Sequence, residues 1–193
     1  MSMTPKSRYV LDGIVPILQT PFHEGGTLDG DSLRRLVDHV IQAGAVGVIC
    51  PAVASEVHKL TPDERRAMVE IALDQARGRV PVFVGVSAES AEESLALARH
   101  AATHGAAGIL AQAPEAIGAD GGQLRAYFRT LARGVDLPLM IQISIQFFKR
   151  VLVAKGIFRT HVVREPILRL DGVQERIAAG LVDRVLAMER DLA

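Results

Sequence analysis

The chain has 193 residues, of which 49% are hydrophobic, and its 22 basic and 22 acidic side chains leave no net charge. This length fits one large domain or two small ones. The balanced charge gives no electrostatic reason to expect a nucleic-acid partner or an anionic membrane. The low aromatic content, 4%, argues against stacking on single strands. One cysteine excludes a disulfide framework and a multi-cysteine metal site.

The sequence shows no segment with the pattern of a signal peptide or a membrane span. Residues 1–10 carry two basic side chains but no apolar stretch of useful length follows them. The longest uncharged apolar run, residues 45–54, is far shorter than the ~20 residues that a span requires. We therefore expect a cytoplasmic protein with no membrane partner.

The first apolar run, residues 13–20, predicts a strand. A helix is expected next, because apolar residues then recur at positions i, i+3, i+4, i+7 and i+8. These residues are Leu33, Leu36, Val37, Val40 and Ile41. Asp31 or Ser32 is expected to open this helix and Gly44 to end it. Residues 45–53, rich in valine and isoleucine, predict the second strand.

Two further helices have clear starting signals. Thr61 is followed by a proline and, three residues on, by Glu64, which is a capping box with a helix-initiating proline. Ser90 and Glu93 form a second box, and glycines at 78 and 105 are expected to end the two helices. A fourth helix face covers residues 124–131. Strands are predicted at residues 81–86, 106–113 and 138–143.

Strand and helix thus alternate over residues 13–144, and the strands are apolar on both faces, as buried parallel strands are. About five strand–helix units of this kind fit an incomplete (β/α) barrel, and an open five-stranded parallel sheet fits equally well. After residue 144 the alternation stops. Residues 147–156 and 165–192 predict helices, the second with a stripe of Ile167, Leu170, Val173, Ile177, Leu181 and Val185. The expected domains are residues 1–145 and 146–193.

Ligands of parallel sheets bind in the loops at the carboxyl ends of the strands. Among these loops, Thr20 begins the first, and Glu56 follows the second strand in a segment of small residues. A carboxylate there can orient backbone amides or be an ordinary surface residue. The glycine-rich residues 118–122 could hold an anion at a helix start, but they lack a phosphate-binding motif, so a simple loop is favoured.

Three other candidates favour a structural role. His100 and His104 share one helix face, but no glutamate follows His100, and two imidazoles alone make a poor zinc site. They lie in the last helical turn, where positive charge is favourable. Cys50 has no fixed base beside it and is expected to be a buried apolar residue. We predict no metal site and no cofactor.

Several of these segments together resemble the dihydrodipicolinate synthase / N-acetylneuraminate lyase family. They are residues 13–22, 44–49, Ser55-Glu56, Lys59-Leu60-Thr61, Glu64-Arg65, 84–86, 105–108, Pro114 and Leu137-Pro138, with further similarity at 149–152 and 164–166. The resemblance implies a TIM barrel with a C-terminal helical extension, often assembled as a homo-oligomer. It also implies a lyase that condenses or cleaves 2-oxo acids such as pyruvate through a lysine Schiff base.

The family's binding loop after the second strand falls on residues 52–56, with Val53, Ala54, Ser55 and Glu56 as its expected site residues, and Thr20 lies in the loop of the first strand. The resemblance implies that these residues hold the substrate carboxylate. Valine and alanine replace the family's threonines, so only backbone amides remain there, and we expect those of Ala54 and Ser55 to serve as a donor pair.

The resemblance fails at the catalytic positions. The fifth-strand tyrosine falls on Gln142, which cannot act as a general acid or base at neutral pH. The sixth-strand lysine has no counterpart, and 193 residues are too few for an eight-unit barrel of about 250. We therefore predict the loss of strands six to eight and of activity. The alternatives are a non-catalytic oligomerising remnant and a binder of small carboxylates.

Overall fold

The computed structural model describes residues 11–117, 121–142 and 145–162, with helical residues 172, 175, 176, 178–180, 182, 183, 186 and 187. The chain divides into two compact units, Met1–Ile141 and Gln142–Ala193. The expected boundary between a partial barrel and a helical extension, after residue 145, stays a prediction. No helix among the described residues is long and apolar enough to cross a membrane.

The first unit is built on a parallel sheet in the order β1-β2-β3-β4. The strands are β1 (Val48–Cys50), β2 (Val82–Gly85), β3 (Gly108–Ala111) and β4 (Leu139–Ile141). In a doubly wound sheet the order reverses at a switch point. Here spatial order follows chain order without reversal, which is the arrangement of a barrel wall. The fold is therefore an incomplete (β/α) barrel, and the open doubly wound sheet is the wrong alternative.

The first apolar run does not form the regular strand that its composition predicts. It touches β1 through a single parallel bridge, Ile17 to Ile49. The Leu18 amide donates to the Ile49 carbonyl at 2.9 Å, and the Ile49 amide donates to the Pro16 carbonyl at 3.0 Å. Proline has no N–H to extend a ladder, so Pro16 limits the pairing of this segment. It runs beside β1 as an irregular fifth element.

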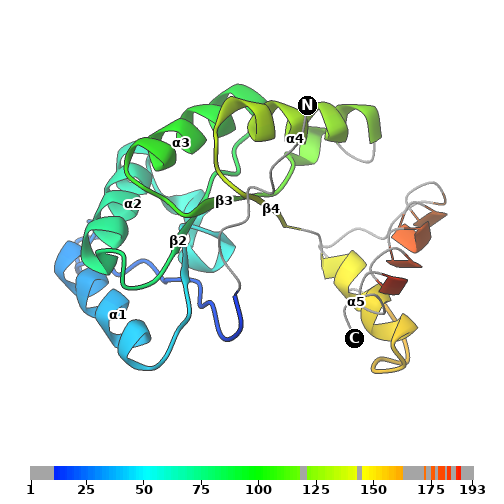
Figure 1. Ribbon diagram of the computed structural model, residues 1–193, viewed down its shortest axis with the longest axis horizontal. Helices are drawn as coiled ribbons and strands as arrows, with labels where there is room; N and C mark the ends of the chain where they lie inside the picture. Colours follow the sequence, from blue (N-terminus) through cyan, green and yellow to red (C-terminus); the bar gives the residue numbers. More distant parts are fainter. Residues whose placement is uncertain are drawn as a thin grey trace. The chain divides into compact units, whose positions relative to one another are not determined.

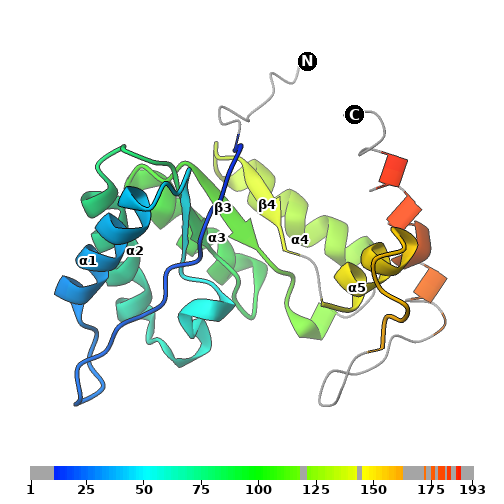
Figure 2. The same cartoon turned by 90° about the horizontal axis from the view of Figure 1, so that it is seen from below.

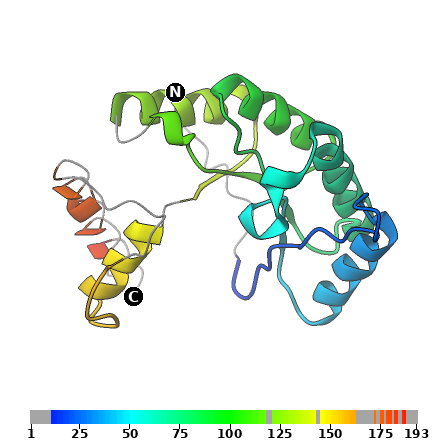
Figure 3. The same cartoon turned by 180° about the vertical axis from the view of Figure 1, so that it is seen from behind.

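Four helices cover one side of the sheet, where they form the outer arc seen in Figures 1 and 3. They are α1 (Gly30–Gln42), α2 (Pro62–Ala76), α3 (Ala91–Thr103) and α4 (Gly121–Gly134). Between them and the strands lies one core, whose largest side chains are almost fully buried: Leu18, Leu33, Met68, Ile109 and Leu131. Each such side chain contributes roughly 1.5–3 kcal/mol by its removal from water.

The helix starts follow the capping signals with two differences. Thr61 and Glu64 form the reciprocal capping box of α2, whereas α3 shows only one half of its predicted box, in which the Ser90 hydroxyl accepts the Glu93 amide at 3.1 Å. Helix α1 begins earlier than predicted, because Asp29 and not Asp31 or Ser32 is its cap. The Asp29 carboxylate accepts the Ser32 amide at 2.9 Å. This bond and the Ser32 hydroxyl lower the pKa of Asp29.

The second unit has a small core of its own. Phe147 on α5 (Ile145–Ala154) packs with Ala178 and Val182, and the half-buried Val151 and Leu186 join them. The guanidinium of Arg150 pairs with Glu175 and lowers the pKa of that carboxyl. The predicted helix over residues 147–156 is thus confirmed. The six stripe residues expected in the last helix lie outside the described residues.

The exposed apolar edge of the sheet leads us to predict self-association. Among the described residues β4 pairs only with β3, and Ile141 at its end is 52% exposed. Free N–H and C=O groups on an apolar edge recruit another chain. Light scattering should therefore report a mass above that of one chain. Ile141→Lys should shift the population toward the monomer.

The matched control is Ile157→Lys, which replaces an exposed isoleucine of the second unit and should leave the assembly unchanged. A stable, monodisperse monomer of the unaltered chain would show that this prediction is wrong.

Candidate functional site

Loops from separate segments lie at the carboxyl ends of the strands, as Figure 2 shows for the turns after β1 and β3. β1 leads into two short 3-10 turns, η1 (Val53–Ser55) and η2 (Val57–Lys59). The first turn holds Val53, Ala54 and Ser55, and Glu56 links it to the second. The chain therefore places the expected loop where a barrel binds its ligands.

Ser55 is the anchor of this loop, and its side chain is fully buried. Its hydroxyl donates to the Leu18 carbonyl and accepts the Ala52 amide at 3.0 Å. The buried hydroxyl of Thr20 donates to the Ser55 carbonyl at 2.6 Å. Buried polar groups need hydrogen-bond partners, and here the Thr20 hydroxyl and the Ser55 carbonyl are partners of each other. Thr20 and Ser55 thus join the first segment to the loop, and their hydroxyls are already committed.

The backbone of the loop corrects one expectation. The Ser55 amide donates to the Ala52 carbonyl at 2.9 Å, inside the turn, so it does not form a free donor pair with the Ala54 amide. The side chains of Val53 and Ala54 are exposed, and Val53 retains 54% of its surface. What the loop offers to a ligand is its exposed edge around Val53 and Ala54.

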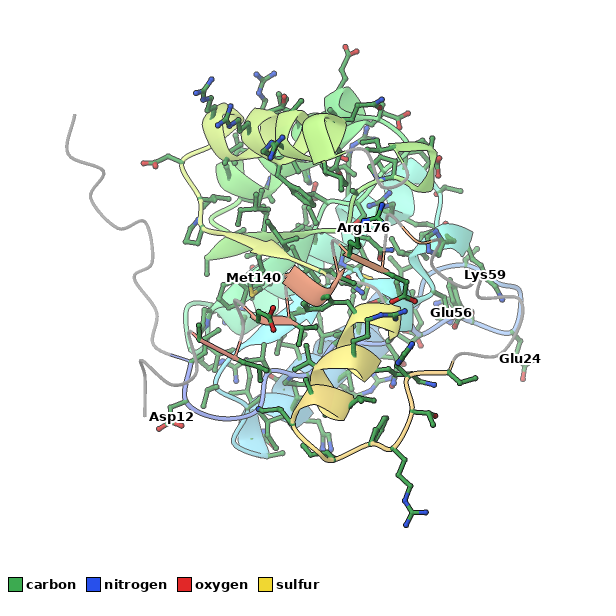
Figure 4. All side chains as sticks on the ribbon, turned by 90° about the vertical axis from the view of Figure 1, so that its right-hand side faces the viewer. Asp12, Glu24, Glu56, Lys59, Met140 and Arg176 are labelled. Carbon is green, nitrogen blue, oxygen red and sulfur yellow. The ribbon has the colours of Figure 1, made fainter. Side chains whose placement is uncertain are left out.

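Glu56 joins the two turns in a left-handed conformation, with φ of 56°. This conformation is uncommon for a residue with a Cβ atom, and such residues cluster at functional sites. Its carboxylate lies 3.4 Å from the Lys59 ammonium, and Figure 4 shows the two side chains together. Both are largely exposed, so the pair contributes at most about 1 kcal/mol. Its main effect is to balance the carboxylate's charge beside the loop.

Gly85 at the end of β2 lets the loop lie against the sheet. A Cβ atom on this residue would sit 1.8 Å from the Pro51 carbonyl oxygen. Close approach of another backbone is a common reason for glycine inside a strand. The position of residues 51 and 52 is therefore fixed by shape as well as by hydrogen bonds.

A second group of polar contacts links the later loops, and sequence reasoning did not assign it. Arg65 of α2 donates to the Ser87 carbonyl at 2.9 Å, and the Ser87 hydroxyl accepts the Gln112 amide at 2.9 Å. The Tyr127 hydroxyl donates to the Gln112 carbonyl at 3.2 Å and lies 2.9 Å from the Ser94 hydroxyl. The only available signal was Arg65, which lies within a segment that resembles the family.

Gln142 is half-buried and begins the second unit, immediately after β4. Its place beside the substrate stays a prediction. Cys50 is fully buried, and burial raises the pKa of its thiol to about 12. The thiol is protonated at neutral pH, so its predicted structural role is confirmed. Of the glycine-rich loop, residues 118–120 lie outside the described residues.

The two histidines need a correction. The ring of His104 caps the end of α3, since its Nδ1 lies 2.8 Å from the His100 carbonyl oxygen. Burial and then the neighbouring His104 lower the pKa of His100, which disfavours the positive charge expected at the helix end. The structure also brings Glu70 of α2 to both rings.

This fold and site define a class of protein. It is the partial (β/α) barrel with a candidate binding loop after its second strand-forming segment. The model of the dihydrodipicolinate synthetase family matches residues 10–146, which is well over half of the chain. The chain belongs to this family.

Curated relatives point the same way. The chain is 42% identical over 130 residues to a 4-hydroxy-tetrahydrodipicolinate synthase of Thermus thermophilus. The matched region covers 67% of this chain and 43% of the relative. The chain is 35% identical over 129 residues to a probable 2-dehydro-3-deoxy-D-pentonate aldolase of Escherichia coli, with the same coverage of both chains.

Among solved structures, YagE of Escherichia coli, a family protein in complex with pyruvate, is 33% identical with a TM-score of 0.66. The likeness covers 69% of this chain and 45% of that one. The chain thus spans less than half the length of these relatives. Such partial coverage fits the predicted loss of strands six to eight. The predicted similarity at residues 149–152 and 164–166 lies outside the range of the family model.

The buried hydroxyl of Ser55 gives a stability prediction. Ser55→Ala should lower the free energy of unfolding by about 2–4 kcal/mol, because the Leu18 carbonyl and the Ala52 amide would be left buried without this partner. Urea unfolding measures the change. The control is Thr130→Ala, which removes an exposed helical hydroxyl and should cost under about 0.5 kcal/mol. Equal effects of the two substitutions would contradict the anchoring role of Ser55.

Proposed function

We propose that this chain is a non-catalytic member of the lyase family that keeps a weak site for a small 2-oxo acid such as pyruvate and uses no cofactor. The observation that carries the proposal is the placement of its four lysines, because the family's chemistry requires a lysine at the end of a strand. The family's carbon–carbon lyase reaction would then be lost while its binding loop is kept. We also expect a cytoplasmic location.

None of the lysines in the described residues lies on a strand. Lys59 is in η2, where it pairs with Glu56 and is 75% exposed. Lys149 is on α5, and its ammonium donates to the Val162 carbonyl at 2.7 Å. Lys155 follows the same helix, and Lys6 lies outside the described residues. A Schiff-base lysine must be deprotonated, which needs a buried or cation-rich setting. Lys59 is exposed and lies beside a carboxylate, so its surroundings are neither buried nor rich in cations.

Gln142 supports the same proposal. A carboxamide neither releases nor takes up a proton near neutral pH. A protein with glutamine in place of the proton-relaying tyrosine would lack general acid–base catalysis even if an amine were supplied from elsewhere. Both halves of the family's chemistry, the nucleophile and the proton relay, are therefore missing from the residues of this chain.

The binding loop gives the reason to propose a residual ligand site. Thr20, Ser55 and Gly85 hold it in place without help from any catalytic residue, and Glu56 is paired by Lys59. A carboxylate ligand would meet a preformed turn rather than a segment that must be ordered. Preorganisation of this kind reduces the entropic cost of binding.

A homo-oligomeric remnant is the second candidate. The observation that favours it is the apolar edge of β4, with Ile141 exposed at its end. In this case the chain would act through contacts between copies and not through a ligand. Binding of a small acid, tested below, separates the two candidates.

We predict that no covalent adduct forms with pyruvate. The chain should show no gain in intact mass after treatment with pyruvate and borohydride, while a full-length family enzyme treated in parallel should gain one reduced pyruvate. Lys59→Arg and Lys149→Arg are the matched variants, because each keeps its charge and removes one amine. A gain that disappears in either variant would overturn the proposal and identify the reactive lysine.

Pyruvate should bind only weakly. Two or three hydrogen bonds of about 0.5–1.5 kcal/mol each give a total of roughly 1–4.5 kcal/mol, and ~4 kcal/mol corresponds to a millimolar dissociation constant. Calorimetry or ligand-observed NMR should therefore find millimolar affinity. Ser55→Ala, which releases the loop, should abolish binding, and Thr130→Ala should leave it unchanged. Micromolar affinity, or no binding at all to the folded chain, would argue against the proposed site.

A further inference from the structure

We propose that Glu70, His100 and His104 form a binding site for a divalent transition metal of the zinc class on the outer surface of the barrel wall. Glu70 comes from α2, and the two histidines lie one helical turn apart at the end of α3. Each side chain offers one ligand atom, and the three atoms lie within 4.8 Å of one another. This site is separate from the carboxylate loop and does not depend on the proposed function.

The distances approach those of a metal centre. With bonds of about 2.0–2.1 Å to nitrogen and oxygen, the ligand atoms of a tetrahedral zinc ion lie roughly 3.3 Å apart. The Nε2 atom of His100 is 3.2 Å from the Glu70 Oε1 atom, and that of His104 is 3.8 Å from the same oxygen. Side-chain rotations close the remaining difference, because Glu70 and His104 are 48% and 40% exposed.

The tautomer of His104 also suits a metal. Its Nδ1 atom lies 2.8 Å from the His100 carbonyl oxygen. A carbonyl can only accept, so this nitrogen carries the proton and Nε2 keeps its lone pair. Metal-bound histidines usually donate their other N–H to a carbonyl or carboxylate, which fixes the ring. Here the helix end supplies that support before any metal arrives.

His100 adds an atom that lacks a partner. Its Nε2 is shielded from solvent and makes no hydrogen bond with any residue that the structure describes, although Glu70 lies close. The carboxylate is therefore near the nitrogen but not in the direction of an N–H bond. A metal ion between the two would satisfy both groups at once.

The donor set defines the class of metal. Two imidazoles and one carboxylate suit zinc, cobalt, nickel or copper, whereas magnesium and calcium prefer oxygen ligands alone. One carboxylate offsets part of the ion's charge. Arg66, which lies near His100, opposes the ion, but its guanidinium is paired with Asp63 at 2.7 Å. Three protein ligands leave a fourth position for water.

The test is a metal titration of the chain carrying no histidine tag. Cobalt(II) reports a tetrahedral site by its visible absorption, and zinc should displace it at a stoichiometry of one per chain. Glu70→Gln and His104→Ala should each weaken binding at least tenfold. Zinc should also raise the melting temperature of the unaltered chain and not that of Glu70→Gln, because a ligand stabilises only the state that binds it.

His39→Ala is the matched control, since His39 is an exposed histidine in the last turn of α1. It should bind cobalt and zinc as the unaltered chain does. The proposal is overturned if His39→Ala weakens binding as much as His104→Ala, if Glu70→Gln has no effect, or if no cobalt spectrum develops. Should His104→Ala fail to fold, His104→Gln is the replacement, and circular dichroism verifies each variant.

Discussion

The first unit depends on one buried hydroxyl. Ser55 links the Leu18 carbonyl to the Ala52 amide, and the Thr20 hydroxyl completes the set by bonding to the Ser55 carbonyl. Without these bonds the first segment would touch β1 through one bridge only, because proline interrupts its ladder. The same few bonds thus hold the start of the barrel wall and shape the turn that we propose as the ligand site. Fold and site share one anchor.

Under the proposed function, this sharing would explain why the loop is kept while the family's chemistry is lost. The groups that hold the loop are a serine, a threonine and a glycine, and none of them is a nucleophile or proton carrier of the family. The catalytic lysine and tyrosine belong to other strands. Under the proposed function, their loss would remove reactivity without removing any support of the loop.

Sequence reasoning predicted the parts that local chemistry determines. The capping residues Thr61 and Ser90 located α2 and α3, and short apolar runs located the four strands. It failed where contacts or bonds beyond the local pattern determine the structure. Pro16 makes the first segment irregular where a strand was predicted. Asp29 caps α1, where Asp31 or Ser32 was predicted. Its position after a strand marked Glu56 as a candidate, but the roles of Val53, Ala54 and Ser55 came only from family resemblance, since small residues carry no chemical signal by themselves.

The cluster of Glu70 with His100 and His104 shows the same limit. The pair on α3 is visible as a spacing of four residues, but its third member lies 30 positions earlier, on another helix. Only the packing of α2 against α3 brings them together, and the sequence contains no periodicity that joins the two. The contacts of Ser87 and Tyr127, which connect the later loops, are hidden from sequence reasoning for the same reason.

Gly85 carries a consequence for the history of such chains. Because Gly85 has no side chain, the loop can lie directly against β2. This steric fit does not depend on the residues at the catalytic positions. Selection on catalysis and selection on shape therefore act on different codons. If the reactive amine is lost as proposed, the loop keeps its shape, and a new reactive side chain at its exposed edge would need no further change in the backbone.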